Sequence, residues 1–371
     1  MKYEALTEFC DLNMGQSPDS KTYNEHGDGM PFYQGNADFG EIHPETCVWC
    51  SKPVKVASEG DILISVRAPI GAMNIATETC CIGRGLAALT PKSNKCSQKY
   101  LYYALESKID VLVSKGTGST FKAISKKVLA ETLIPSYTDE KQQQITDALS
   151  KIDVLITDRK QQLIEMDLLV KSRFIELFGD IIGNRTLPLI RLSELADIGS
   201  SKRIYANEYV ESGIPFYRSK EIRELGTGLK PSVELFIKRE RYDEIREKYG
   251  VPKVGDILIA AIGATIGYSW IVDTDSPFYY KDGNLIVLSI KDNVNPIFLN
   301  HAMGILIEDF KKKGVAGSAQ LALTIEKLEK MMVVNPELEL QNQFAAFVAQ
   351  VDKSKYCRCK SSRLLQRVAS I

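Results

Sequence analysis

The sequence lacks the short motifs that mark common nucleotide-binding and catalytic sites. The dipeptide Gly-Lys does not occur, which excludes a GxxxxGK[ST] phosphate-binding loop. No GxGxxG sequence opens a helix after a strand, and neither HExxH nor GxSxG is present. The three histidines, His26, His43 and His301, are too scattered for a histidine-based metal site. We therefore expect no catalytic site, no metal site and no cofactor of these classes.

Long apolar runs and net charge are also missing. No stretch approaches the roughly 18 consecutive apolar residues of a membrane span. The start MKYEALTEFCDLN lacks the basic residues and apolar run of a signal peptide, so we expect a cytoplasmic protein. The 47 basic and 47 acidic residues cancel, which argues against nonspecific binding of polyanions. Local basic faces stay compatible with this balance, because a phosphate senses charge only within a Debye length of about 10 Å.

Cysteine is present but gives no clear metal-binding spacing. Of the eight cysteines, only Cys47 and Cys50 form a CxxC pair, and no second pair follows at zinc-ribbon spacing. A site that adds Cys80 and Cys81 stays open. Reduced, unligated thiols are the interpretation that a cytosolic protein favours.

What the sequence does contain is a duplication of most of its length. The segment GDILI occurs at 60–64 and again at 255–259. From Gly118 to Asp153 the second copy follows without a gap at an offset of 199 residues. Such a repeat is far longer than the 20–50 residue units of solenoids, so we expect two similar globular domains. Further matching pairs are 6–12 with 192–198 and 29–33 with 213–217.

A long helix is predicted after each copy. Over Asp139–Phe178 apolar residues recur at alternating intervals of three and four, which is typical of a coiled-coil seam. Forty residues make a rod of roughly 60 Å, and its apolar stripe needs a partner helix, which 336–371 supplies. The matched Arg159 and Arg358 either fix the register or contact an external partner. The predicted pairing residues are Ile145, Leu149, Ile152, Ile156, Leu163, Met166, Val170, Leu177, Phe344, Val348, Val351 and Leu365.

These patterns predict an α+β fold with four segments. Residues 1–136 and 181–335 form two similar mixed α/β domains, and 137–180 and 336–371 form two long antiparallel helices that pair as a coiled coil. The arrangement repeats with pseudo-two-fold symmetry. Strands are predicted at 61–66, 85–90, 256–262 and 284–290, with helices at 97–113 and 296–313.

Several short motifs occur in a fixed order. They are GQSP at 15–18, GDILI with Arg67 and Gly71, IGRGL at 82–86, GSTFKAI at 118–124, Ile134-Pro135 before Glu140-Lys-Gln142, and KSRFIELFG at 171–179. Their order, and the duplication, resembles the specificity subunit of type I restriction–modification systems over essentially the whole chain. The second copy departs from this pattern, with Gln320 and Leu321 in place of Phe121 and Lys122, and Ser200–Arg203 in place of GQSP.

The resemblance implies that each domain is a target-recognition domain for one half of a split sequence in double-stranded DNA. It implies that the helices set the gap and dock two methyltransferase (modification) subunits, with restriction/translocase subunits as further partners. The chain itself would be non-catalytic and carry no cofactor. S-adenosylmethionine, ATP and Mg²⁺ would sit on the partners of a complex that methylates adenine and cleaves DNA.

Candidate DNA contacts follow from the side chains that bind base edges and phosphates: Arg and Lys, Asn and Gln, Ser and Thr. For each, a solvated loop position is the competing interpretation, since most DNA contacts carry no sequence information. In the first copy the candidates are Gln16, Ser17, Gln34, Asn36, Arg67, Arg84, Ser119, Thr120 and Lys122. In the second they are Lys202, Arg203, Arg218, Lys220, Lys281, Asn284, Ser318 and Gln320.

Two other functions stay open on the sequence alone. One is a restriction or modification enzyme with its own active site, because 47 acidic residues leave many possible carboxylate pairs. The other is a protein-interaction scaffold with two heads on a coiled coil and no nucleic acid.

Overall fold

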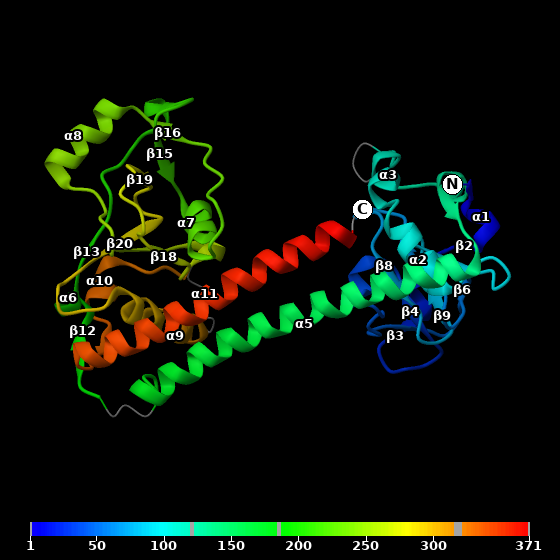
Figure 1. Cartoon of the computed structure of the whole chain (residues 1–371), viewed down its shortest axis with the longest axis horizontal. Coiled ribbons are helices and arrows are strands. Elements are labelled where there is room, and N and C mark those ends of the chain that lie inside the picture. Colours follow the sequence, from blue (N-terminus) through cyan, green and yellow to red (C-terminus); the bar gives the residue numbers. More distant parts are fainter. Residues whose placement is uncertain (1, 119–121, 184–186, 315–320, 370–371) are drawn as a thin grey trace. The chain divides into compact units, whose positions relative to one another are not determined.

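A computed structural model describes residues 2–118, 122–183, 187–314 and 321–369, with side chains up to Lys355. The chain divides into two compact units, one of Met1–Arg159 with Ser361–Ile371 and one of Lys160–Lys360. Helix α5 (Asp139–Phe178) begins in the first unit and ends in the second (Figure 1). The domain boundaries at 136, 180 and 335 remain predictions.

Two sheets form the first unit. The GDILI segment becomes β7, a strand whose four residues are all buried because both of its faces are covered. It lies in a sheet of order β2-β10-β7-β8, and a second sheet has the order β3-β5-β4-β9-β6. The first sheet comprises β2 (Cys10–Met14), β7 (Ile62–Ser65), β8 (Met73–Ile75) and β10 (Leu86–Pro91). The second comprises β3 (Tyr23–Asn24), β4 (Met30–Tyr33), β5 (Trp49–Cys50), β6 (Val56–Ala57) and β9 (Cys80–Ile82).

The helices of the first unit are short, apart from α5. The single helix predicted over 97–113 is wrong in one respect, because it is broken into α2 (Gln98–Glu106) and α3 (Ile109–Ser114). The Ser107 hydroxyl donates to the Ala104 carbonyl at 2.7 Å, and Lys108 leaves the helical region with φ −107° and ψ 0°. The unit also contains α1 (Leu6–Phe9), α4 (Lys126–Ala130), and β1 (Lys2–Ala5) paired with β11 (Leu133–Ser136).

The second unit repeats this plan, which confirms the predicted pair of mixed-sheet halves. Its GDILI strand is β17, in a sheet of order β13-β20-β17-β18, and a second sheet has the order β14-β16-β15-β19. The strands are β12 (Leu189–Arg191), β13 (Ala196–Gly199), β14 (Tyr209–Val210), β15 (Ile214–Tyr217), β16 (Phe236–Ile237), β17 (Ile257–Ala260), β18 (Ser269–Ile271), β19 (Tyr279–Tyr280), β20 (Leu285–Ile290) and β21 (Met332–Val334). The helices are α6 (Leu192–Leu195), α7 (Ser219–Gly226), α8 (Arg239–Tyr249), α9 (Pro296–Gly314), α10 (Ile325–Glu329) and α11 (Leu338–Ala369).

Within the second unit α5, α9 and α11 pack together, side by side in Figure 1. Phe174 of α5 has its ring centroid 5.3 Å from Phe344 of α11 and 6.0 Å from Phe298 of α9. Farther along, Lys355 of α11 contacts Asp167 of α5 at 2.6 Å. Because the residue numbers rise on one helix as they fall on the other, α5 and α11 are antiparallel, as predicted.

The buried face of α5 differs in detail from the predicted seam. Val170, Phe174 and Phe178 are buried, whereas Met166 and Leu177 are partly buried and Arg173 lies with its guanidinium 5.9 Å from the Phe347 ring centroid. A helix with 3.6 residues per turn drifts from a heptad row, and α9 widens the covered face. Phe344, Val348 and Val351 join this core. Ile145 instead packs against the core of the first unit. Leu149, Ile152, Ile156 and Leu163 are half-buried, and the side chain of Leu365 lies outside the described part.

Candidate nucleic-acid interface

Three loops meet at one end of the strands in the first unit. They follow β2, β4 and β9, and they approach so closely that glycine is required. A Cβ on Gly15 would lie 2.2 Å from the Gly83 carbonyl oxygen, and one on Gly85 would lie 2.4 Å from that of Gln34. Two backbone hydrogen bonds join the loops, from Gln16 N to Ile82 O at 3.0 Å and from Gly85 N to Gln34 O at 3.2 Å. The loops that carry the candidate residues are therefore rigidly held together.

A pocket of about 350 Å³ in the second unit and one of about 230 Å³ in the first mark two recessed surfaces. The smaller one is lined by four predicted DNA contacts, Gln34, Asn36, Arg67 and Arg84, together with Ser65 and three small residues. These four side chains come from the loops after β4, β7 and β9, spread over 51 positions of sequence from 34 to 84. The fold thus concentrates the amide and guanidinium groups that the sequence analysis selected.

The two arginines of this pocket have fixed backbones and exposed side chains. The Arg84 backbone N–H donates to the Ser17 hydroxyl at 3.2 Å, and the Ser65 hydroxyl donates to the Arg67 carbonyl at 2.8 Å. Lys122 lies beside them, because its carbonyl accepts a hydrogen bond from Ala68 at 3.0 Å. Within the part of the chain that the structure covers, neither guanidinium forms an ion pair. Ser119 and Thr120 lie outside the described residues.

The candidate cations of the second unit differ from Arg67 and Arg84, because most of them already form ion pairs with carboxylates. Arg203 Nε contacts Asp282 at 2.7 Å. Arg218 binds the fully buried Glu221 at 2.8 Å and Glu234 at 2.9 Å, and Lys220 binds Glu234 at 2.7 Å. The hydrogen bonds from Lys220 and Arg218 lower the pKa of Glu234 to about 2. The hydrogen bond to Glu221 raises the pKa of Arg218, and that to Glu234 raises the pKa of Lys220.

The other candidates of the second unit occupy the matching loop ends. Lys281 donates its backbone N–H to Tyr217 O at 2.9 Å, just as Gly83 donates to Tyr33 O at 2.8 Å. Asn284 ends the same turn and accepts from Ala261 N at 2.8 Å. Ser318 and Gln320 lie outside the described residues.

Arg67 of the first unit corresponds to the apolar Ile262 of the second. Arg67 bridges to Ala123, and the matching bridge in the second unit joins Ile262 to Ala322. The two loop clusters therefore share a backbone frame but offer different side-chain chemistry. The sequence of the two copies does not indicate this difference in ion pairing, because Asp282, Glu221 and Glu234 lie at separate points in the chain.

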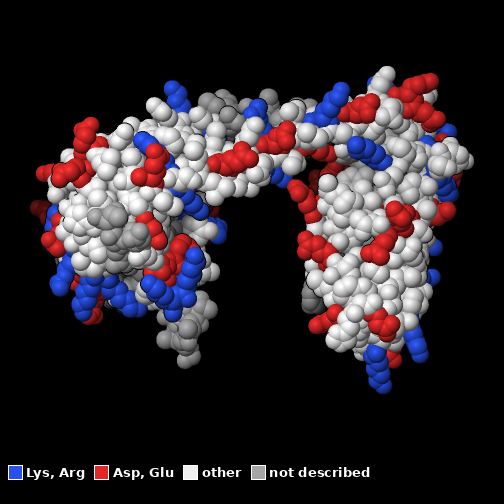
Figure 2. Space-filling model, turned by 90° about the horizontal axis from the view of Figure 1, so that it is seen from below, with Lys and Arg blue, Asp and Glu red and all other residues white. Residues whose placement is uncertain are grey.

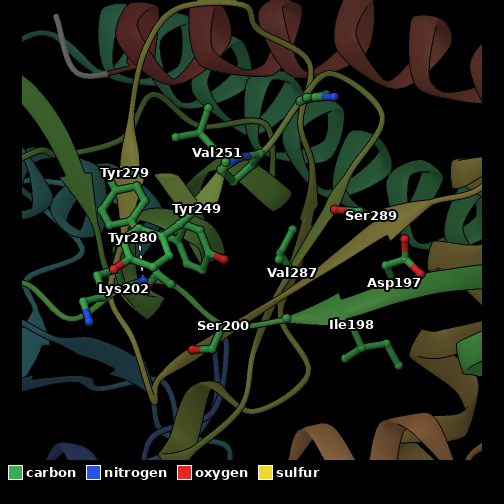
Figure 3. A pocket seen from close by; sticks show the side chains of 15 residues that line it. Asp197, Ile198, Ser200, Lys202, Tyr249, Val251, Tyr279, Tyr280, Val287 and Ser289 are labelled. Carbon is green, nitrogen blue, oxygen red and sulfur yellow. Dashed lines mark hydrogen bonds between the residues drawn. The ribbon is translucent and has the colours of Figure 1, made fainter. Parts of the chain in front are cut away.

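The larger pocket combines aromatic and basic side chains (Figure 3). Tyr249, Tyr279 and Tyr280 line one side with Lys202, whose ammonium lies 5.4 Å from the Tyr249 ring centroid. Lys202 also donates its backbone N–H to the Tyr279 hydroxyl at 2.7 Å. Burial raises the pKa of the Tyr280 hydroxyl, and that of Tyr279, above the ordinary value. Ile198, Val287 and Ser289 of the neighbouring strands complete the opposite side.

This pocket lies where a strand of the first unit has no paired counterpart among the described residues of the second. In the first unit β6 pairs with β9, and Asn13 Nδ2 donates to Val56 O at 2.7 Å. The matching residues of the second unit are Val251 and Pro252, and Pro252 has no N–H to donate to a strand. Gly250, with φ of 77°, ends α8 just before them. The space between this segment and β19 is left open.

Acidic and basic side chains are interspersed over the face shown in Figure 2. Among the described residues, no group of three or more His, Cys, Asp or Glu side chains could hold a metal ion. Cys50, Cys80 and Cys81 are buried free thiols, and Cys47 is exposed. The helices that the structure covers include none long and apolar enough to cross a membrane.

Comparison with known proteins gives consistent matches. A family model for the type I restriction modification DNA specificity domain matches residues 1–166 and 186–357. The chain is 45% identical over 157 residues (42% of this chain) to a putative type I restriction enzyme MjaX specificity subunit of Methanocaldococcus jannaschii, and 32% identical over 163 residues (43% of this chain) to the putative specificity subunit S.HindORF215P of Haemophilus influenzae. These matches cover only 36% and 39% of the two relatives.

Two solved structures share the fold over nearly the whole chain. The type I restriction-modification S subunit from M. genitalium superposes with a TM-score of 0.56 at 17% identity, over 99% of this chain and 93% of that one. A chain from a study of assembly and conformational transition of the type I R-M system gives a TM-score of 0.63 at 16% identity, over 100% and 95%.

Proposed function

The chain belongs to the family of type I restriction modification DNA specificity domains, and on this premise we propose that it recognises a split sequence in duplex DNA, with one half bound by each unit. The observation that supports this most directly is the pocket lined by Gln34, Asn36, Arg67 and Arg84 in the first unit. Its guanidinium and amide groups are the donors and acceptors that distinguish bases in the major groove.

The chemistry of this pocket favours a half-site that contains guanine and adenine. Arginine binds guanine O6 and N7, and Asn or Gln binds adenine N6 and N7, each good pair contributing about 1–3 kcal/mol of discrimination. Arg67 and Arg84 are free to do so without first breaking an ion pair within the described residues. The proposal thus assigns base recognition in the first half-site to these two arginines.

The test is a base-by-base binding selection on Arg67→Ala and Arg84→Ala. Each change should relax the preference at one or two positions of the first half-site and leave the second half-site intact. Lys52→Ala is the matched control, because Lys52 is an exposed cation of the same unit that does not line the pocket. An unchanged base profile in both arginine variants would rule them out as the residues that recognise bases.

For the partners, an exposed apolar stripe on α5 supports docking of a methyltransferase subunit. Ile164, Leu168 and Ile175 are 54%, 53% and 55% exposed, and their spacing places them on one helical face. The side chains of Val170 and Phe174, on another part of the helix surface, are buried in the core of the second unit. Leu168→Asp should weaken capture of the modification subunit at least tenfold while DNA binding persists. Exposed Lys160 on the same helix provides the control substitution, Lys160→Asp.

The family assignment also bears on catalysis. A specificity subunit of this family is non-catalytic. We propose that methyl transfer and cleavage, with S-adenosylmethionine, ATP and Mg²⁺, belong to two methyltransferase subunits and to restriction/translocase subunits. The purified chain, incubated with DNA, Mg²⁺ and labelled methyl donor, should show no turnover; methylation or cleavage by the chain alone would contradict this assignment.

A further inference from the structure

Two cations and two carboxylates form one cluster where β15 ends and α7 begins. Arg218 Nη2 donates to Glu221 Oε1 at 2.8 Å and to Glu234 Oε2 at 2.9 Å. Lys220 Nζ donates to the other oxygen of Glu234, Oε1, at 2.7 Å. Glu234 thus bridges both cations, and the four groups together carry no net charge.

The two carboxylates have different structural roles. Glu221 is fully buried and caps α7, because its Oε2 accepts the Arg218 backbone N–H at 2.8 Å. The Glu234 side chain is 57% exposed and comes from the segment between α7 and β16. Among the residues that the structure describes, its carboxylate contacts only the two cations, whose hydrogen bonds lower its pKa to about 2 and keep it ionised at neutral pH. Glu221 therefore supports the fold, whereas Glu234 offsets the positive charge of Arg218 and Lys220 at the surface of the loop.

The first unit has the structural carboxylate but not the exposed one. At the matching strand end Asp38 accepts the backbone N–H groups of Gln34 at 2.7 Å and Gly35 at 3.1 Å, which is the role of Glu221. The loop carries Gln34 and Asn36 in place of Arg218 and Lys220. Among the described residues, Glu234 has no counterpart beside them. The exposed carboxylate is thus present in the unit whose loop carries the two cations and absent from the described part of the other unit.

We propose that Glu234 is a specificity-determining residue that keeps Arg218 and Lys220 from binding DNA phosphates at arbitrary sequences. The inference rests on the proposed function. A free Arg–Lys pair would bind phosphates wherever it met them, and phosphate contacts carry no sequence information. With Lys220 held by Glu234, and Arg218 held by Glu234 and Glu221, this loop binds DNA only where contacts to base edges replace the ion pairs. Removal of the carboxylate should therefore increase affinity and reduce discrimination.

The experiment compares the full chain with its Glu234→Gln variant. The probes are one duplex that carries the selected split sequence and one of equal length with the second half-site scrambled, each titrated from about 50 to 400 mM KCl. Because each phosphate contact adds about 0.9 to the slope of log affinity against log salt, release of Lys220 should steepen it by about one, while Arg218 keeps its ion pair with Glu221. Affinity for the scrambled duplex should rise severalfold near 50 mM KCl. The ratio of the affinity for the selected duplex to that for the scrambled duplex should therefore fall.

Two variants serve as controls. Glu247→Gln makes the same change in net charge on α8, where Glu247 forms no ion pair within the described residues, and it should leave the duplex ratio unchanged. Glu234→Asp keeps the charge and should behave as the unmodified chain. A gain in affinity cannot come from loss of folding.

The outcomes separate this inference from the proposed function. If the unmodified chain shows no preference for a split sequence, the proposed function fails and the inference fails with it. If the preference is present but Glu234→Gln leaves slope and ratio unchanged, only the inference is overturned. It is likewise overturned if Glu234→Gln weakens binding to both duplexes, because the carboxylate would then serve the fold.

Discussion

The contact between the long helices predicts a large, local loss of stability on one substitution. Phe344 of α11 is fully buried among Phe174 and Phe178 of α5, with ring centroids 5.3 and 5.6 Å away, and His301 of α9 at 5.2 Å. Phe344→Ala removes a ring that touches two other helices and leaves a cavity at their junction. Buried Phe→Ala changes cost about 3–5 kcal/mol, and we expect the upper half of that range because rigid rings surround the site. The cost falls on the second unit.

Urea unfolding followed by circular dichroism, with hydrogen exchange to localise the loss, measures this effect. Leu169→Ala is the matched control on α5, because Leu169 is 51% exposed and should change the free energy of unfolding by less than about 0.5 kcal/mol. Phe344→Leu should cost clearly less than Phe344→Ala. A loss below about 1 kcal/mol for Phe344→Ala, or protection lost evenly across both units, would refute the packing argument.

Three further predictions concern titration, thiol chemistry and salt. Burial lowers the pKa of His301, which faces Asp352, Lys355 and Asp167. The unfolded chain therefore binds the proton more readily than the folded chain does. The stability of the second unit should fall as the pH drops below about 6.5. His301→Gln should flatten that pH profile in unfolding experiments, and an unchanged profile would exclude His301 as its source. Burial raises the pKa of the Cys80 thiol to about 12, so site-resolved mass spectrometry should find exposed Cys47 alkylated at pH 8 while Cys80 stays unmodified until unfolding; equal rates would contradict its burial. Arg84→Ala should leave the salt slope of DNA binding nearly unchanged, because Arg84 is assigned to base edges; a fall of about one in that slope would show a phosphate contact and contradict the assignment.

Long-range features of the fold were predictable because repetition and periodicity carry them. The α5 boundaries, Asp139–Phe178, agree with the predicted helix, since an uninterrupted apolar pattern ends at a glycine. The repeated glutamines Gln142 and Gln341 are both buried at the start of a long helix, where their amides bond to nearby backbone carbonyls. A matched pair in the repeat thus turned out to hold the helix ends in place.

Features that depend on three-dimensional neighbours were not predictable. The identities of Arg67 and Arg84 marked them as candidates, but nothing in the sequence placed them with Gln34 in one pocket. Likewise Arg218 looked equivalent to a free arginine, although Glu221 and Glu234 hold it. Ion pairs between residues 16 positions apart leave no periodic signal. The seam residues Phe174 and Phe178 were missed because α9 also covers α5, which a two-helix pattern does not include.

The central claim is that two similar units bind two half-sites whose separation is fixed, and a gap-length series tests it most directly. Each inserted base pair shifts the second half-site by about 3.4 Å and rotates it by about 35°. The full chain with its modification partner should bind the selected split sequence tightly at one gap length and lose at least tenfold in affinity when the gap changes by one pair in either direction. Equal affinity across gap lengths, or a selected site with a single block, would contradict the account.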